Sequence, residues 1–130
     1  MTTPLTVLYV DDDDDIRSIA TMSLELDPDM TVAAAASGAE ALALLEDESL
    51  RPDVILLDVM MPEMDGPTLA RHLCVMPRLR GVPLLFMTAR ARQADIAGYY
   101  ALGAAAVISK PFDPLGLAAE IRAVLARIEG

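Results

Sequence analysis

Cysteine, aromatic residues and a signal segment are scarce or missing in this sequence. The single cysteine, Cys74, excludes a disulfide within the chain. With 4% aromatic residues and no tryptophan, any core must be built mainly from aliphatic side chains. The first residues lack the basic stretch that opens a secretory signal, and no apolar run reaches the ~20 residues that cross a bilayer. We therefore expect a cytoplasmic protein without a membrane segment, folded as one domain over residues 1–130.

Basic residues are also few, with ten against twenty acidic ones and a net charge of −10. Because a nucleic-acid backbone is bound through basic residues, we expect no direct nucleic-acid binding. Sixteen acids and two arginines lie up to Asp65, whereas four acids, seven arginines and one lysine follow it. No acid lies between Arg71 and Arg92. We interpret this basic stretch as solvated surface that pairs with the acidic half, rather than as a docking patch for an acidic partner.

Hydrophobic periodicity predicts five units of a strand followed by a helix. Short apolar runs predict strands at 7–10, 31–36, 54–57, 84–87 and 106–109. Capping and turn residues predict helices that begin near Asp14 or Asp15, Ser37, Pro67, Gln93 and Asp113. Short connections between such units require right-handed crossovers and parallel strands. The predicted fold class is α/β, a three-layer (βα)5 domain with helices on both faces of a parallel sheet.

Four of the apolar runs end in polar residues of different chemical kinds, namely Asp11, Asp58, Thr88 and Lys110. The carboxyl ends of parallel strands meet at one edge of a sheet, which is where open α/β sheets bind ligands. We therefore expect these four side chains to lie close together.

The acidic run Asp11–Asp15 follows the first predicted strand directly, and carboxylates gathered there repel one another unless a cation joins them. A calcium loop starting at Asp11 would need Gly and Glu where the chain has Ile16 and Met22, so that type of site is excluded. Mg²⁺ fits better, with Mn²⁺ as the alternative, because Mg²⁺ binds through one or two carboxylates and keeps other oxygen ligands. Asp58 can supply a further carboxylate from a neighbouring strand.

Thr88 and Lys110 are candidates for contacts to a phosphoryl group. The small residue Ala89 follows Thr88 and leaves the threonine hydroxyl accessible. Lys110 is the only lysine among ten basic residues, and its compact ammonium is a suitable point charge for a phosphate.

Taken together, these segments resemble the receiver domain of two-component response regulators, from about Thr6 to Ile128. The resemblance is carried by VLYVDDDDDIR, DVILLDVMMPEMDG, FMTA and VISKPF in this order. It implies a flavodoxin-like sheet of strand order 2-1-3-4-5 and a stand-alone protein similar to chemotaxis regulators.

The resemblance implies that Asp58 is the phosphoacceptor. It would take a phosphoryl group from a histidine kinase or a histidine phosphotransfer protein and become a 4-aspartylphosphate. Asp11, Asp12, Asp58 and the main-chain carbonyl of Met60 would hold Mg²⁺. Such a protein is a signalling switch that catalyses only its own phosphorylation and slow dephosphorylation.

Three further roles are implied for residues after the phosphoacceptor. Lys110 would neutralise charge on the phosphoryl group, Thr88 would donate a hydrogen bond to it, and the Lys110–Pro111 peptide bond would be cis. The signal would then leave through the face of the fourth helix, the fifth strand and the fifth helix, toward an unknown downstream protein.

One position departs from the family pattern. Val107 stands where the family commonly has the aromatic residue that swings inward with the threonine. Tyr99 and Tyr100 are substitutes on the fourth helix, although one of them is expected in the core. We assign Ala89 and Arg90 to tuning of the switch, and we hypothesise that Arg90 alters the lifetime of the phosphoryl group.

Three other interpretations remain. A phosphatase of the haloacid-dehalogenase type would use Asp11 as nucleophile and Asp13 as acid, but Asp15 departs from that motif and the chain has no room for a cap domain. A receiver that is never phosphorylated is disfavoured by the complete set of site residues. A receiver cut from a hybrid histidine kinase stays open.

Overall fold

The computed structural model of the chain describes residues 3–89 and 92–129, the last of these through its backbone alone. The strands are β1 (Leu5–Val10), β2 (Met30–Ala35), β3 (Val54–Asp58), β4 (Leu84–Thr88) and β5 (Ala106–Ser109). The helices are α1 (Asp14–Glu25), α2 (Gly38–Leu45), α3 (Gly66–Cys74), α4 (Gln93–Ala101) and α5 (Leu117–Glu129), with a short 3-10 helix at Pro77–Leu79. No helix in this part of the chain is long and apolar enough to span a membrane.

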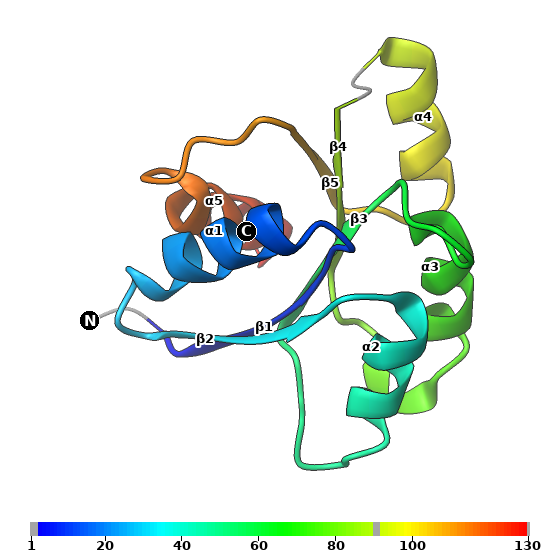
Figure 1. Cartoon of the computed structure of the whole chain (residues 1–130), viewed down its shortest axis with the longest axis horizontal. Coiled ribbons are helices and arrows are strands. Elements are labelled where there is room, and N and C mark those ends of the chain that lie inside the picture. The colour runs from blue at the N-terminus through cyan, green and yellow to red at the C-terminus, as the bar shows by residue number, and fades with distance from the viewer. Residues whose placement is uncertain (1–2, 90–91, 130) are drawn as a thin grey trace.

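The five strands form one parallel sheet in the order β2-β1-β3-β4-β5. Helices α1 and α5 cover one face, and α2, α3 and α4 cover the other (Figure 1). The predicted fold class and strand order are confirmed. The central strand β3 is buried along its whole length, as its continuous apolar sequence indicates.

The sheet separates two hydrophobic cores. One lies between the sheet and α1 and α5, and it includes Tyr9, Leu56 and Met87. The other lies beneath α2, α3 and α4, and it includes Phe86, on which Tyr99 packs with ring centroids 5.3 Å apart. Tyr99 is therefore the tyrosine of α4 that joins the core.

The helix starts follow local capping by polar side chains. Ser37 caps α2 by accepting a hydrogen bond from the amide of Glu40, at 3.0 Å, as predicted. The cap of α1 is Asp13 rather than Asp14 or Asp15, since its carboxylate accepts from the amides of Asp15 and Ile16.

Two helix starts also differ by a few residues from the sequence-based prediction. Helix α5 begins at Leu117, because Asp113 accepts from the amides of Leu115 and Gly116 and so closes a turn before the helix. Helix α3 begins at Gly66, one residue before the predicted Pro67.

Arginines from the basic half of the chain, Arg122 and Arg78, contact the acidic half. Arg122 of α5 forms an ion pair with Asp27, with Nε and Oδ2 2.6 Å apart. Arg78 donates to the main-chain carbonyl oxygens of Leu45 and Leu50, which lie at and after the end of α2 in the acidic half. At least this residue of the basic stretch serves the fold, since it binds the carbonyl groups where α2 ends.

The start of α3 lies against the backbone of Asp58, and only glycine fits there. A Cβ on Gly66 would come within 2.4 Å of the Asp58 carbonyl oxygen and 3.0 Å of the Val59 Cα. The amide of Gly66 also donates to the carbonyl of Val59, at 2.9 Å. The loop between β3 and α3 is thereby held tightly beside Asp58.

We expect Gly66→Ala to lower the free energy of unfolding by about 2 kcal/mol, because the added methyl group must push the backbone of Asp58 aside. Gly98→Ala is the matched control, since a Cβ there meets nothing within 4 Å and alanine favours the helix. Urea denaturation monitored by circular dichroism measures both. Equal midpoints for Gly66→Ala and the wild type would contradict the close contact.

Candidate functional site

The carboxyl edge of the sheet brings the four predicted strand-end residues together. Asp11 follows β1, Asp58 and Thr88 end β3 and β4, and Lys110 follows β5. They border a pocket of about 280 Å³, lined by Asp11, Asp12, Asp13, Ile16, Asp58, Met60, Thr88, Ala89 and Lys110. Asp11 is fully buried, whereas Asp58 and Thr88 keep 6% and 2% of their surface exposed.

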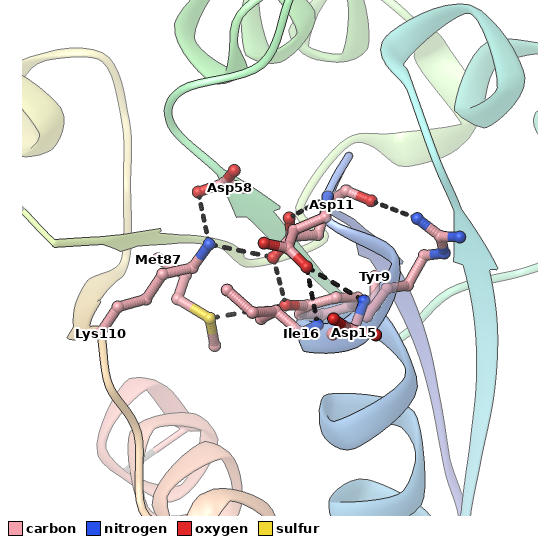
Figure 2. A network of polar contacts seen from close by, with 9 residues as sticks. Tyr9, Asp11, Asp15, Ile16, Asp58, Met87 and Lys110 are labelled. Atoms are coloured by element: carbon pink, nitrogen blue, oxygen red, sulfur yellow. Dashed lines mark hydrogen bonds and ion pairs between the residues drawn. The ribbon is translucent and has the colours of Figure 1, made fainter.

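The ammonium of Lys110 bridges the two buried carboxylates. Its Nζ lies 3.0 Å from Oδ2 of Asp11 and 2.9 Å from Oδ1 of Asp58 (Figure 2). The backbone of the same lysine donates to the carbonyl of Thr88, at 2.9 Å, which ties the end of β5 to the end of β4. The ammonium of Lys110 thus joins two carboxylates, one 99 and the other 52 residues before it in the sequence.

Burial and crowding shift the protonation of these groups. Burial raises the pKa of Asp58 to about 6, and the neighbouring charges of Asp11 and Asp12 add to this rise, against the hydrogen bond from Lys110. Burial alone would lower the pKa of Lys110, but its hydrogen bonds to Asp58 and Asp11 outweigh burial and raise it. Lys110 is therefore an ammonium at neutral pH, and it does not fully compensate the carboxylates around it.

The three acidic residues that surround the pocket fit a hard divalent cation. Asp11, Asp12 and Asp58 each offer a carboxylate oxygen, and these oxygens lie within 4.8 Å of one another. Carboxylate oxygens are the ligands that Mg²⁺ and Mn²⁺ prefer. Asp12 is exposed, so the cluster opens to solvent at one side, and Met60 lies on the pocket wall.

The carboxylate of Asp11 is held from several directions. Its Oδ2 accepts a hydrogen bond from the Tyr9 hydroxyl at 2.7 Å, and its Oδ1 accepts one from the amide of Asp13 at 3.0 Å. The main-chain carbonyl oxygen of Asp11 accepts from Nη1 of Arg17 at 2.9 Å. Burial raises the pKa of the Tyr9 phenol, and the charge of Asp11 and the hydrogen bond to it add to the rise, so Tyr9 keeps its proton and donates it to Asp11 in the hydrogen bond.

Tyr9 and Arg17 are the site residues that the sequence did not single out. A signal for Tyr9 exists, because residues two apart on a strand face the same side, and Tyr9 precedes Asp11 by two. The tyrosine is also the only hydrogen-bonding side chain in the buried run Val7–Val10.

The remaining predicted positions lie around this centre. The Lys110–Pro111 peptide bond is cis, as the resemblance implies. Val107 is half-buried on β5, where it pairs in register with Phe86. Ala89 lies exposed at the pocket, and Arg90 lies outside the described residues.

Comparisons with known proteins agree on one family. The family model of the response regulator receiver domain matches residues 7–122. The chain is 36% identical to the response regulator Rre1 of Synechocystis sp. over 127 residues, which are 98% of this chain and 54% of that protein. It spans about half the length of the first curated relatives that it matches.

Solved structures show the same fold. The chemotaxis response regulator CheY4 of Vibrio cholerae superposes with a TM-score of 0.84 at 32% identity, covering 95% of this chain and 99% of that one. The signal receiver domain of a signal transduction histidine kinase from Syntrophus aciditrophicus superposes with a TM-score of 0.79 at 31% identity, covering 95% and 92%.

Proposed function

The chain belongs to the response regulator receiver domain family, and from this premise we propose that it is a signalling switch whose phosphoacceptor is Asp58. The observation that carries the assignment to this residue is the placement of Asp58 at the end of the central strand, beside the only lysine of the chain and two further carboxylates. We propose that residues 1–130 act as one receiver domain.

In the proposed reaction, a carboxylate oxygen of Asp58 attacks the phosphorus of a phosphohistidine on a histidine kinase or a phosphotransfer protein. A P–O bond forms, the P–N bond breaks, and the imidazole leaves with its electron pair and takes up a proton. The product is an acyl phosphate on Asp58. Lys110 lies 2.9 Å from this carboxylate, so its ammonium is in place to neutralise charge on the transferred group.

We assign the metal to Asp11, Asp12 and Asp58, with the main-chain carbonyl of Met60 as a further ligand. When bound, Mg²⁺ would supply positive charge that the single ammonium of Lys110 cannot provide, and Mn²⁺ would serve as a substitute. Thr88 at the end of β4 is proposed to donate its hydroxyl to the transferred phosphoryl group, with Ala89 leaving the approach open. We keep Arg90 as a proposed tuning residue.

The output of the switch is proposed to be contact with another protein through α4, β5 and α5. On this face Val107 replaces the family's usual aromatic residue, while Tyr99 is fixed on Phe86 and Tyr100 is 49% exposed. Tyr100 is therefore our candidate for an aromatic contact to the downstream protein. Whether the chain works alone or within a longer protein, such as a hybrid kinase, this surface is the proposed exit of the signal.

The alternative with Asp11 as nucleophile is disfavoured by its surroundings. Asp11 is fully buried, and both of its carboxylate oxygens accept hydrogen bonds from protein donors. Asp58 retains some exposure beside the pocket, so an incoming phosphorus atom reaches it more easily.

We expect the wild-type protein to gain one phosphoryl group when it is incubated with acetyl phosphate and Mg²⁺, and to remain unmodified when EDTA replaces the metal. The reason is that three carboxylates around one ammonium repel a phosphoryl donor unless a divalent cation joins them. Intact-mass spectrometry measures the gain, and peptide mapping after borohydride trapping locates it. A phosphoryl group on Asp11, or equal modification in EDTA, would contradict the proposal.

A further inference from the structure

Tyr9 is a buried tyrosine whose hydroxyl contacts Asp11, one of the acidic residues that line the pocket. The residue lies in β1 with no exposed surface, packed in the core on the α1 and α5 side of the sheet. Its hydroxyl is 2.7 Å from Oδ2 of Asp11 and 3.6 Å from Sδ of Met87 (Figure 2). At these distances, Asp11 is the strong acceptor of the phenol proton and the thioether sulfur is a weak one.

The donors around Asp11 divide its two oxygens between them. Oδ2 accepts from both Tyr9 and Lys110, at 2.7 and 3.0 Å, while Oδ1 accepts from the amide of Asp13 at 3.0 Å. The backbone of Asp11 is also fixed, because its amide donates to the carbonyl of Ala35 at 3.1 Å. The orientation of the carboxylate is thus determined by a phenol, an ammonium and an amide.

Lys110 and Tyr9 differ in how firmly they hold Asp11. Lys110 divides its ammonium between Asp11 and Asp58, and its side chain is 15% exposed at the pocket. Tyr9 is fully buried in the core. If the phenol were absent, the Oδ2 atom would retain only the ammonium as donor, and the carboxylate could turn toward it. A carboxylate drawn into a closer pair with Lys110 is a poorer partner for a divalent cation.

We propose that Tyr9 is a positioning residue for the metal site, whose hydroxyl holds Asp11 in the orientation in which it shares a divalent cation with Asp12 and Asp58. The inference rests on the proposed function, because it requires that these carboxylates bind Mg²⁺. Groups that hydrogen-bond to metal-binding carboxylates from behind fix their orientation, and their loss typically weakens metal binding 10- to 100-fold. Phenylalanine has the same ring and lacks only the donor, so Tyr9→Phe isolates this contact.

We expect Tyr9→Phe to weaken Mg²⁺ binding about 10-fold, measured by isothermal titration calorimetry on the full chain. Two control variants are expected to bind Mg²⁺ within about twofold of the wild type. Tyr100→Phe makes the same chemical change at an exposed tyrosine, and Met87→Leu alters the core beside the phenol while keeping its bond to Asp11. Far-UV circular dichroism verifies that each variant is folded.

A double-mutant cycle with Asp11→Asn tests whether Tyr9 acts through Asp11. The Tyr9→Phe change is expected to have less than about a twofold effect on Mg²⁺ binding in the Asp11→Asn background, because the carboxylate it orients is gone. An equal loss in both backgrounds would overturn the inference, as would an equal loss in Met87→Leu, which would indicate core packing. Wild-type binding of Mg²⁺ with an unchanged affinity in Tyr9→Phe would overturn it too. By contrast, a wild type that neither binds Mg²⁺ nor accepts phosphate would overturn the proposed function itself.

Discussion

Asp58→Asn is expected to abolish phosphoryl transfer to this protein while making its metal-free fold more stable. The amide of asparagine is not a nucleophile that forms an acyl phosphate, so intact-mass spectrometry after treatment with acetyl phosphate and Mg²⁺ should detect no added phosphoryl group. Asp15→Asn is a matched control, because it removes an exposed carboxylate of the acidic run next to the site. That control should be phosphorylated like the wild type.

The gain in stability follows from the raised pKa of Asp58. The carboxyl group has a pKa of about 6 in the fold against 3.8 ordinarily, so the folded state holds its proton more tightly than the unfolded chain. Well below pH 3.8 the carboxyl group is protonated in both the folded and the unfolded state, so it does not lower the free energy of unfolding. As the pH rises from there to about 6, Asp58 ionises in the unfolded chain but stays protonated in the fold. Above about pH 6 the free energy of unfolding of the wild type is therefore lower by up to about 3 kcal/mol.

The asparagine side chain of this variant would carry no charge to be buried, although Lys110 would lose one partner. We therefore expect the variant to be more stable than the wild type by about 1–3 kcal/mol at about pH 7, with the difference vanishing near about pH 4. Urea denaturation in EDTA at a series of pH values measures it. Saturating Mg²⁺ should narrow the difference, because the cation stabilises the ionised wild type. A variant less stable than the wild type throughout this range would show that Lys110 already balances the carboxylates.

Lys110→Met should have the opposite effect on stability and also impair phosphorylation. The methionine keeps the aliphatic stem but removes the ammonium that lies 3.0 and 2.9 Å from two buried carboxylates. Buried charges left without their partner typically cost about 3–5 kcal/mol, so we expect the metal-free protein to lose about 3 kcal/mol at about pH 8. Phosphorylation by acetyl phosphate should slow about 100-fold, because the charge that offsets the incoming group is gone.

The loss of stability in Lys110→Met should shrink as the pH falls toward about 6. Lys110 lowers the pKa of Asp58 in the wild type, so without it the carboxyl group takes up its proton at a higher pH and the repulsion is relieved. Lys110→Arg is the informative control, because it keeps the charge but replaces a compact ammonium with a planar fork. It should regain much of the stability and less of the phosphorylation rate. If Lys110→Met unfolds at the same urea concentration as the wild type in mildly alkaline buffer, the ammonium does not stabilise the fold by bridging the two carboxylates.

The strand-end residues could be placed from the sequence because topology determines where strand ends lie. Asp11, Asp58 and Thr88 come at the ends of buried apolar strands, Lys110 directly follows β5, and parallel strands necessarily bring such ends to one edge. The strand order itself required the family resemblance, since crossover rules alone allow several orders. The burial of Asp11 and the bridging contacts of Lys110 depend on exact distances between residues up to 99 positions apart, which no local pattern contains.

Other features could not be predicted, because the sequence does not show which neighbour a given residue contacts. Five consecutive aspartates offered several caps for α1, and the choice of Asp13 follows from which carboxylate reaches two free amides. The close packing of Gly66 on the carbonyl of Asp58 was likewise invisible, because the sequence shows only a glycine in a turn. Tyr9 looked like one more core residue until its hydroxyl was seen to reach Asp11.

The solitary lysine gives this protein a built-in spectroscopic reporter. Reductive methylation with isotope-labelled formaldehyde modifies amines, and Lys110 is the only side chain of the sequence that carries one. Since this ammonium lies against both Asp11 and Asp58, the label would yield one side-chain resonance at the centre of the pocket, beside that of the terminal amine. Cation binding and phosphoryl transfer could then be followed on a single nucleus, without engineering a probe into the chain.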